Sequence, residues 1–506
     1  MTAAGLPVTL ADGRAQAEGT IEFPLKPVLG PGDTKFDFTA KLTELRSSVL
    51  VPDHVVTASE LDLVANLEDG LRISGLARLG QISGRGLWSR PLGPGVDRKS
   101  VLTAEVNLDQ AFLDELNIGL PDGTLRGSGS GTLQIDLPDG AAPTFELSSN
   151  LRGLRLGLPA VGWSKAADQT GKLTVSGQLG QQPRIDLLDI DVAGLAARGS
   201  LSIAADGGLG QAQFDRVRIG GWFDAPVTLR GRGPNRAVGI EVAGGRMDFR
   251  RATFGDSAGQ GGPMEIVLDS LQISEGIALT DFRGSFNAEG GFSGQFTARL
   301  NGGAAVTGTV VPQSGRSAIR LRGTDAGLAF KSIGLIQNAS GGNLDLVMIP
   351  TATEGNYDCQ LEVTDLRVKD APALAGLLDA ISVVGLLQQM DGQGLAVTNV
   401  DARFRLTQDQ IIVTEASAVG PGLGISLYGT YTLANTVMDF QGVVSPIYLI
   451  NGIGSILTRR GEGLIGFNYN LRGPLSEMKV GVDPLSVLTP GMFRDIFRRP
   501  PPQVGQ

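Results

Sequence analysis

The chain has 506 residues, including 73 glycines, 26 prolines, 5% aromatic residues and 42% hydrophobic residues. This aliphatic content is too high for a disordered chain, and the glycines follow no Gly-X-Y period, which excludes collagen. With 43 Lys and Arg against 52 Asp and Glu, the net charge of −9 argues against a nucleic-acid partner, which needs clustered cations.

The first residues, MTAAGLPVTLADG, lack the basic and apolar regions of a secretory signal. No run of about 18 apolar residues follows anywhere in the chain, so the sequence predicts no transmembrane helix. Because a strand-like pattern, GTIEFPL, begins almost at once, we expect a fragment or a start inside a longer protein. The single cysteine, Cys359, excludes an intramolecular disulfide and leaves the cellular compartment open.

Alternation of apolar and polar residues recurs along the chain, at 36–42, 61–67, 132–137, 343–348 and 402–406. Strict alternation is typical of a strand with one apolar and one polar face. Turn sequences such as EDG, PDG and NGG separate the runs. We expect the apolar faces to line a shared surface, formed by Phe36, Phe38, Leu61, Leu63, Leu133, Ile135, Leu137, Leu344, Leu346, Phe404 and Leu406.

Few helical patterns are available to cover so many one-sided strands, although an apolar sheet face must be covered by something. One solution is a series of stacked sandwich domains. The other is a mainly β fold in which a long curved antiparallel sheet forms an elongated groove (a β-taco) filled by ligand. The lack of clear linkers favours the groove. We predict a repetitive groove region at 1–325 and a C-terminal region at 326–506.

One amphipathic helix is predicted at about 371–390, within the C-terminal region. Its apolar residues recur at steps of three and four, with Asp370 as a candidate N-cap and Pro372 in the first turn. The apolar positions are Leu374, Leu377, Leu378, Ile381, Val384 and Leu387. A few short helices near the C-terminus, including a weaker one in PGMFRDIFRR, complete the expected fold.

The sequence carries little that suggests catalysis. His54 is the only histidine, and we expect it at a junction between a turn and a strand. The sequence GDSAG at 255–259 formally matches a nucleophile elbow, but no histidine follows Ser257 and no helix pattern begins there. The usual zinc sites are excluded, and no calcium or phosphate-binding motif is present, although the sequence leaves open a Ca²⁺ or Mg²⁺ site made of Asp and Glu alone and a pair of carboxylates that meet in space. We therefore predict no enzyme activity, no metal and no cofactor.

The most apolar stretch, GVVSPIYLINGIGSIL at 442–457, is too short and too interrupted to span a membrane. It opens a predicted terminal cap at about 442–499. One interpretation is a cap that closes the last open sheet edge. The other is a lip that contacts the receiving membrane, made by Ile447, Tyr448, Leu449, Ile450, Arg459 and Arg460.

Six segments in fixed order resemble the C-terminal region of the AsmA-like family, in its long, inner-membrane-anchored periplasmic branch. They are GLAFKSIGLIQNASGGNLDL, LRVKDAPALAGLLDAIS, GLAVTNVDARFRL, ASAVGPGLGISLYGTY, GVVSPIYLING and GLIGFNYNLRGPLSEMKVGVDPLSVLTPGMFRDIF, between Gly327 and Phe497. Earlier segments such as VRIGGWFDAPVTLRG are similar to the repeat region of these proteins.

The resemblance implies a repeating β-groove of the bridge-like lipid-transfer superfamily, which moves phospholipid across the periplasm. The implied partners are phospholipid or another acyl lipid, membrane surfaces at the groove ends, and outer-membrane or periplasmic proteins. The family carries an N-terminal membrane anchor, and no sequence pattern for one is visible here, so the resemblance leaves anchoring of this chain open. A structural factor for outer-membrane assembly that carries no lipid is the alternative function. An adhesin-like β-helix is disfavoured, because the Leu-Arg-Gly triplets at 125, 151, 229, 321 and 471 are unequally spaced.

Overall fold

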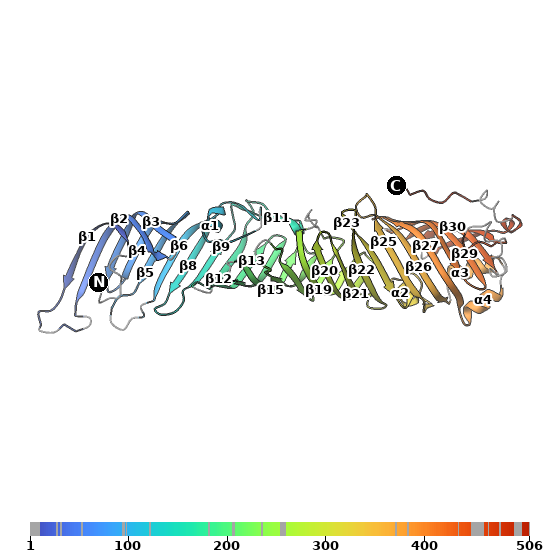
Figure 1. The fold of residues 1–506 in the computed structure, drawn as a ribbon, viewed down its shortest axis with the longest axis horizontal. Coiled ribbons are helices and arrows are strands. Elements are labelled where there is room, and N and C mark those ends of the chain that lie inside the picture. The colour runs from blue at the N-terminus through green and yellow to red at the C-terminus, as the bar shows by residue number, and fades with distance from the viewer. Residues whose placement is uncertain are drawn as a thin grey trace. The chain divides into compact units, whose positions relative to one another are not determined.

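The structure is a computed structural model of the whole chain. It describes residues 11–26, 29–30, 33–51, 54–93, 97, 99–120, 123–180, 183–204, 208–233, 236–252, 260–369, 372–381, 384–433, 435–446, 460–463, 465–474, 477–489 and 498–504. The predicted fold class is confirmed: the protein is mainly β, built from curved antiparallel sheet with a few short helices (Figure 1).

The chain forms two compact units. Unit 1 comprises Met1–Ala243 with Arg251–Ser257, and unit 2 comprises Gly244–Arg250 with Ala258–Gln506. The boundary that the sequence suggested between 325 and 326 falls inside unit 2, between its strands and a short helix. Among the described residues, no helix is long and apolar enough to cross a membrane.

In unit 1 the strands follow one another as antiparallel neighbours in a main sheet, apart from three short strands that form a small sheet of their own. The main sheet contains β1 (Asp12–Glu22), β2 (Lys35–Val51), β3 (His54–Asn66), β4 (Gly70–Leu79), β5 (Ile82–Arg90), β6 (Ser100–Leu108), β8 (Gly129–Leu137), β9 (Thr144–Ser149), β12 (Gly171–Gln178), β13 (Arg184–Val192), β14 (Leu195–Ile203), β15 (Leu209–Ile219), β16 (Phe223–Arg230) and β17 (Gly239–Ala243). The small sheet contains β7 (Leu125–Gly127), β10 (Leu154–Leu158) and β11 (Trp163–Lys165), and a 3-10 turn, η2 (Pro159–Val161), lies beside it.

Unit 2 continues the same kind of antiparallel meander, with one short parallel pairing between its first two strands. Its strands are β18 (Arg246–Asp248), β19 (Gln260–Gln272), β20 (Ala278–Glu289), β21 (Ser293–Leu300), β22 (Ala305–Gln313), β23 (Arg316–Gly323), β24 (Ala339–Ser340), β25 (Asn343–Pro350), β26 (Tyr357–Val368), β27 (Leu395–Leu406), β28 (Gln410–Val419), β29 (Leu423–Thr432), β30 (Val437–Pro446), β31 (Phe467–Pro474) and β32 (Lys479–Asp483), followed by the 3-10 helix η5 (Pro484–Leu488).

The helices differ from the expectation in number and place. Unit 1 contains α1 (Gln110–Glu115), and unit 2 contains α2 (Ala326–Ser332) well before its end. Both begin at an aspartate whose carboxylate accepts a backbone N–H of the first turn, Asp109 for α1 and Asp325 for α2. Neither has the length for a clear amphipathic period, which explains why the sequence pattern did not reveal them.

The stretch predicted as one helix at about 371–390 forms two, α3 (Pro372–Ala380) and α4 (Val384–Asp391). Pro372 opens α3, as expected, and Asp370 lies outside the described residues. Ile381, the described residue between the two helices, is β-branched, and such residues lose side-chain freedom in a helix.

Candidate functional site

An unbroken row of apolar residues and glycine crosses the main sheet of unit 1. Directly opposite residues on antiparallel strands point to the same face, so the register identifies the row strand by strand from β1 to β17. Its members are Ala17, Ala40, Leu63, Ile73, Trp88, Leu102, Ile135, Phe145, Gly177, Ile185, Leu201, Ala212, Leu229 and Ile240.

A second row runs beside the first, two residues away on each strand except β13, where a register shift between Ile185 and Leu188 makes the separation three residues. It contains Ala15, Leu42, Leu61, Gly75, Gly86, Ala104, Leu133, Leu147, Val175, Leu188, Gly199, Phe214, Val227 and Val242. Four of the predicted lining residues therefore lie in these rows, and Phe36, Phe38 and Leu137 share their face by strand alternation. We call this surface the apolar face of unit 1.

The opposite face of the same strands is polar. Lys41 pairs with Glu60 and lies 3.8 Å from Asp62 across β2 and β3. Further along, the Arg216 guanidinium contacts Asp224 at 2.7 Å across β15 and β16. Each of these surface ion pairs contributes little to stability, but together they show which face of the sheet is turned to solvent.

Most side chains of the apolar face are partly exposed rather than buried. Leu63, Ile73, Leu102, Leu133 and Ile135 all keep contact with solvent. In a packed sandwich the inner-face residues of both sheets interdigitate and leave water. The apolar face of unit 1 is therefore only partly withdrawn from water.

Unit 2 repeats this arrangement. One row contains Ile266, Gly284, Phe296, Gly308, Leu321, Leu346, Leu361, Ala402, Ala416 and Leu427. A second contains Met264, Phe286, Gly294, Val310, Ile319, Met348, Cys359, Phe404, Val413, Gly429, Phe440, Leu471 and Val480. The predicted residues Leu346 and Phe404 lie in these rows, and Leu344 and Leu406 share their face, opposite Val363 and Tyr357.

Glycines in these rows give aromatic rings room to lie across the sheet. A Cβ added at Gly308 would stand 2.1 Å from Cζ of Phe296, and one at Gly294 would stand 2.6 Å from Cδ1 of Phe286. The ring of Phe282 lies between these two, with centroids 5.1 Å from Phe296 and 6.3 Å from Phe286. The rings of Phe296 and Phe286 each lie over a glycine of the neighbouring strand, so aromatic rings form this part of the apolar face of unit 2.

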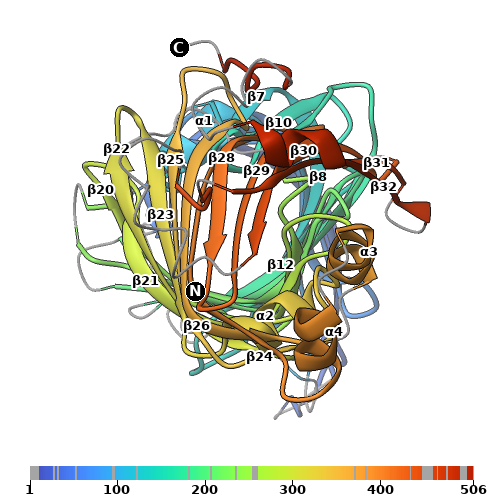
Figure 2. The ribbon, with the colours of Figure 1, turned by 90° about the vertical axis from the view of Figure 1, so that its right-hand side faces the viewer.

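At the end of unit 2 the two helices α3 and α4 cover the apolar face. Leu377, Leu378 and Met390 are at most 3% exposed and pack with Val444 and Tyr469 of the last strands. Partly buried row residues such as Leu427 and Leu471 border this cluster. Figure 2 shows the curvature of the unit 2 sheet, with α3 and α4 on the side toward which it curves. The apolar face of unit 2 is thus its concave face, closed by helices at its C-terminal end.

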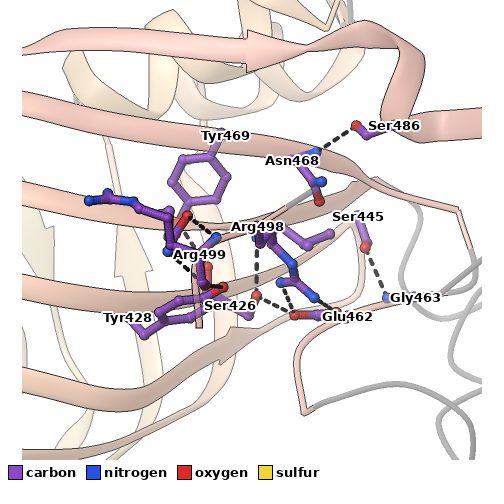
Figure 3. A network of polar contacts seen from close by, with 12 residues as sticks. Ser426, Tyr428, Ser445, Glu462, Gly463, Asn468, Tyr469, Ser486, Arg498 and Arg499 are labelled. Carbon is purple, nitrogen blue, oxygen red and sulfur yellow. Dashed lines mark hydrogen bonds and ion pairs between the residues drawn. The ribbon is translucent and has the colours of Figure 1, made fainter. Parts of the chain in front are cut away.

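The polar face of the same last strands is covered as well, by residues 460–463 and the segment at Arg498 (Figure 3). Glu462 and Arg498 form a buried ion pair at 2.7 Å, with side chains 1% and 3% exposed. Ser426 Oγ accepts the N–H of Val443 at 3.1 Å and donates to Glu462 at 2.8 Å. A buried pair with additional hydrogen bonds holds a single geometry, because separating its members leaves a charge without compensation.

Two further contacts hold this terminus. Tyr469 donates its hydroxyl proton to the carbonyl of Ser426 at 2.8 Å, and burial raises the pKa of this phenol. Arg499 contacts Asp439 at 2.6 Å, and the guanidinium lowers the pKa of that carboxyl. Both faces of the sheet are therefore covered at the end of unit 2.

Of the residues predicted to form a membrane lip, Arg460 is described. It is exposed, and its guanidinium lies 3.4 Å from Asp401 of β27. Because Asp401 alternates with the row residue Ala402, this contact is on the polar face. Ile447, Tyr448, Leu449, Ile450 and Arg459 lie outside the described residues, as do Ser257 of the GDSAG motif and most of the predicted terminal helix at 490–499.

Two residues that the sequence analysis considered for chemistry, His54 and Cys359, lie among groups that hold the fold together. His54 is the first residue of β3, and its Nδ1 lies 2.9 Å from the Glu115 carboxylate at the end of α1. The same carboxylate accepts the N–H of Gln81, and these hydrogen bonds lower the pKa of Glu115. Burial raises the pKa of the Cys359 thiol to about 12. Within the described ranges no group of acidic, histidine or cysteine residues is placed to hold a metal ion.

Sequence reasoning missed most members of the rows. Strands such as β4 and β22 carry glycines at inward positions, as in AVTGTVV, where Val306, Gly308 and Val310 alternate with threonine. Counting glycine as an apolar-face residue in such runs would have extended the predicted surface. Comparisons of the chain with models of protein families, with curated proteins and with solved structures give no match. The resemblance to the AsmA-like family therefore stays a prediction that rests on the sequence motifs.

Proposed function

We propose that the chain is a non-enzymatic lipid-binding and lipid-transfer protein of the bacterial envelope. The observation that carries this proposal is the pair of unbroken apolar rows in each unit, most of whose side chains stay partly exposed. An acyl chain laid along such rows leaves water without meeting a charge.

The energetic reason is the size of the barrier that the surface removes. Each methylene withdrawn from water contributes about 0.8 kcal/mol, so a chain of roughly sixteen carbons that crosses water bare faces a barrier of about 10 kcal/mol or more. A surface that repeats Leu, Ile, Val, Phe and Gly offers similar contacts at each step. Because neighbouring positions bind an acyl chain with similar free energy, the chain can move along the surface without being held at one position.

The proposal includes the AsmA-like membership and its consequences. The cargo is phospholipid or another acyl lipid, the location is the periplasm, and the ends of the groove contact membrane surfaces. No step requires a nucleophile or a metal, because transfer moves a molecule without changing its bonds.

The test uses Ile135, which lies in the first row of unit 1 on β8. An Ile135→Asp substitution places a carboxylate on the apolar face, and we expect uptake of a fluorescent sixteen-carbon acyl probe to fall at least about 10-fold, since an uncompensated polar group against hydrocarbon costs more than the 1.4 kcal/mol of one decade. Thr103→Asp is the matched control, because Thr103 is exposed on the polar face of the adjacent strand β6. We expect the control to bind the probe like the original chain.

Two outcomes would contradict the proposal. Delipidated protein that takes up no acyl probe and transfers no phospholipid between vesicles would exclude lipid carriage. Unfolding of the Ile135→Asp variant, detected by circular dichroism, would identify a packed core in place of a binding surface.

A structural role in outer-membrane assembly is the second candidate. It is favoured by the closed end of unit 2, where α3 and α4 cover one face of the last strands and residues 460–463 with the segment at Arg498 cover the other. Protein purified without detergent and carrying no phospholipid by native mass spectrometry would support this role over transfer.

A further inference from the structure

The first strand of unit 1 presents an edge that the described part of the chain leaves open. Within the described ranges β1 pairs with β2 alone, and all 11 of its residues are exposed. Its residues, DGRAQAEGTIE, include no proline and no lysine, and the pairing with β2 is regular from Arg14 to Glu22. Natural edge strands are usually shortened, bulged, charged with lysine or covered, because a long regular edge is a template for another strand.

The last strand of unit 2 shows such protection. β32 has 5 residues, and α3 packs against it, with a Cβ added at Gly376 lying 3.6 Å from Val480. The open edge of β1 is therefore not a general property of this fold.

The alternation of β1 is that of the interior strands. Ala15, Ala17 and Ile21 lie on the apolar face, opposite Leu42, Ala40 and Phe36. Arg14 and Glu18 lie on the polar face with Gln16, and Arg14 remains exposed although it lies 3.6 Å from Glu44. A strand added to this edge would extend both apolar rows if its own alternation matched.

We propose that β1 pairs with β1 of a second copy of this chain, antiparallel, with Gln16 facing its own counterpart. A twofold axis perpendicular to the sheet relates the two strands, so the two apolar faces lie on the same side. This inference is independent of what the faces bind.

The register follows from the faces and the charges. Matching apolar to apolar faces requires that a residue, not a peptide bond, lie on the twofold axis, since a shift by one residue reverses every side chain. With Ala15 on the axis, Asp12 would face Glu18 of the other copy. With Ala17 on the axis, Asp12 would face Glu22, and with Glu18 on the axis that residue would face itself. All three central alternatives bring like charges together.

With Gln16 on the axis the charges are complementary. Arg14 of each copy then faces Glu18 of the other, and Asp12 faces Thr20. Two opposite-charge cross-strand pairs form and no like-charge pair does. Of the central registers of β1, this one alone satisfies both the faces and the charges.

The experiment is sedimentation velocity of the full chain across the micromolar concentration range. We expect a concentration-dependent dimer. Arg14→Glu turns two attractive pairs into repulsive ones and should weaken dimerisation at least about 10-fold. The double change Arg14→Glu with Glu18→Arg restores opposite charges and should restore the dimer.

A cross-link gives a second, independent measurement. Gln16→Cys should form a covalent dimer on mild oxidation or with a short bis-maleimide. Thr20→Cys should not, since its counterpart would lie eight residues away along the strand pair, roughly 27 Å. The native Cys359 is buried and gives a low background. A chain that stays monomeric, or a dimer that is insensitive to Arg14→Glu and does not cross-link through residue 16, would overturn the inference.

Discussion

At the end of unit 2, where α3 and α4 cover the apolar face, we expect a closed core without water in place of a binding surface. Leu378 of α3 is 0% exposed and lies at the centre of the cluster formed with Met390, Val444 and Tyr469. Replacing it by alanine removes three carbon atoms, worth about 2.4 kcal/mol of transfer free energy at about 0.8 kcal/mol each. The cavity left behind adds to this, so we expect a loss of about 3 to 4 kcal/mol, within the range measured for buried leucines.

A matched variant on the same face gives the contrast. Leu346 belongs to a row of unit 2 but is partly exposed. Because fewer of its contacts are lost and no closed cavity forms, we expect Leu346→Ala to cost about 1 kcal/mol.

The assay has to resolve the end of unit 2 from the rest of the chain. The three tryptophans, Trp88, Trp163 and Trp222, all lie in unit 1, so tryptophan fluorescence does not report this region. Hydrogen exchange by mass spectrometry does. We expect amides of β29 and β31 to exchange about 100-fold faster in Leu378→Ala, as a loss of about 3 kcal/mol in opening free energy requires. If Leu378→Ala accelerates exchange of these amides no more than Leu346→Ala does, the idea that Leu378 lies in a closed, water-free core is wrong.

Two further predictions concern the stability of the sheets. Gly308→Ala should destabilise unit 2 by about 1 to 3 kcal/mol in chemical denaturation, because the new Cβ meets the ring of Phe296. The loss should be smaller when Phe296 is also replaced by alanine. If the free-energy changes of the two substitutions simply add, the contact between them is contradicted. Acid should destabilise the fold, since hydrogen bonds from Lys99 and Arg320 lower the pKa of Asp136 and Asp345 from the ordinary 3.8. The stability that such carboxylates contribute is fully present above their ordinary pKa and is lost as the pH falls through the lowered pKa of the folded state. Asp345→Asn should therefore flatten the dependence of the unfolding free energy on pH below about 4. An unchanged slope would show that Asp345 does not contribute to the acid sensitivity.

Some elements were visible in the sequence for a local reason. A run such as FDFTAKL places Phe36 and Phe38 on one face whatever the strand pairs with, and this strand belongs to β2. The stripe with Leu377 and Leu378 predicted a helix, and both residues are buried in α3. The sequence pattern did not reveal the role of glycine: Gly308 and Gly294 lie inside strands, next to aromatic rings.

The sequence by itself determined the composition of each face, because the two-residue period of a strand depends on backbone geometry alone. It also determined the low number of helices, since few stretches have a helical period. The continuity of the rows was decided by the register of strands far apart in the chain, as when Leu102 meets Ile135. The burial of Glu462 with Arg498 and the packing of α3 and α4 on the concave face were likewise decided by tertiary structure. Such contacts depend on which surfaces the folded sheet leaves uncovered, and no local pattern contains that information.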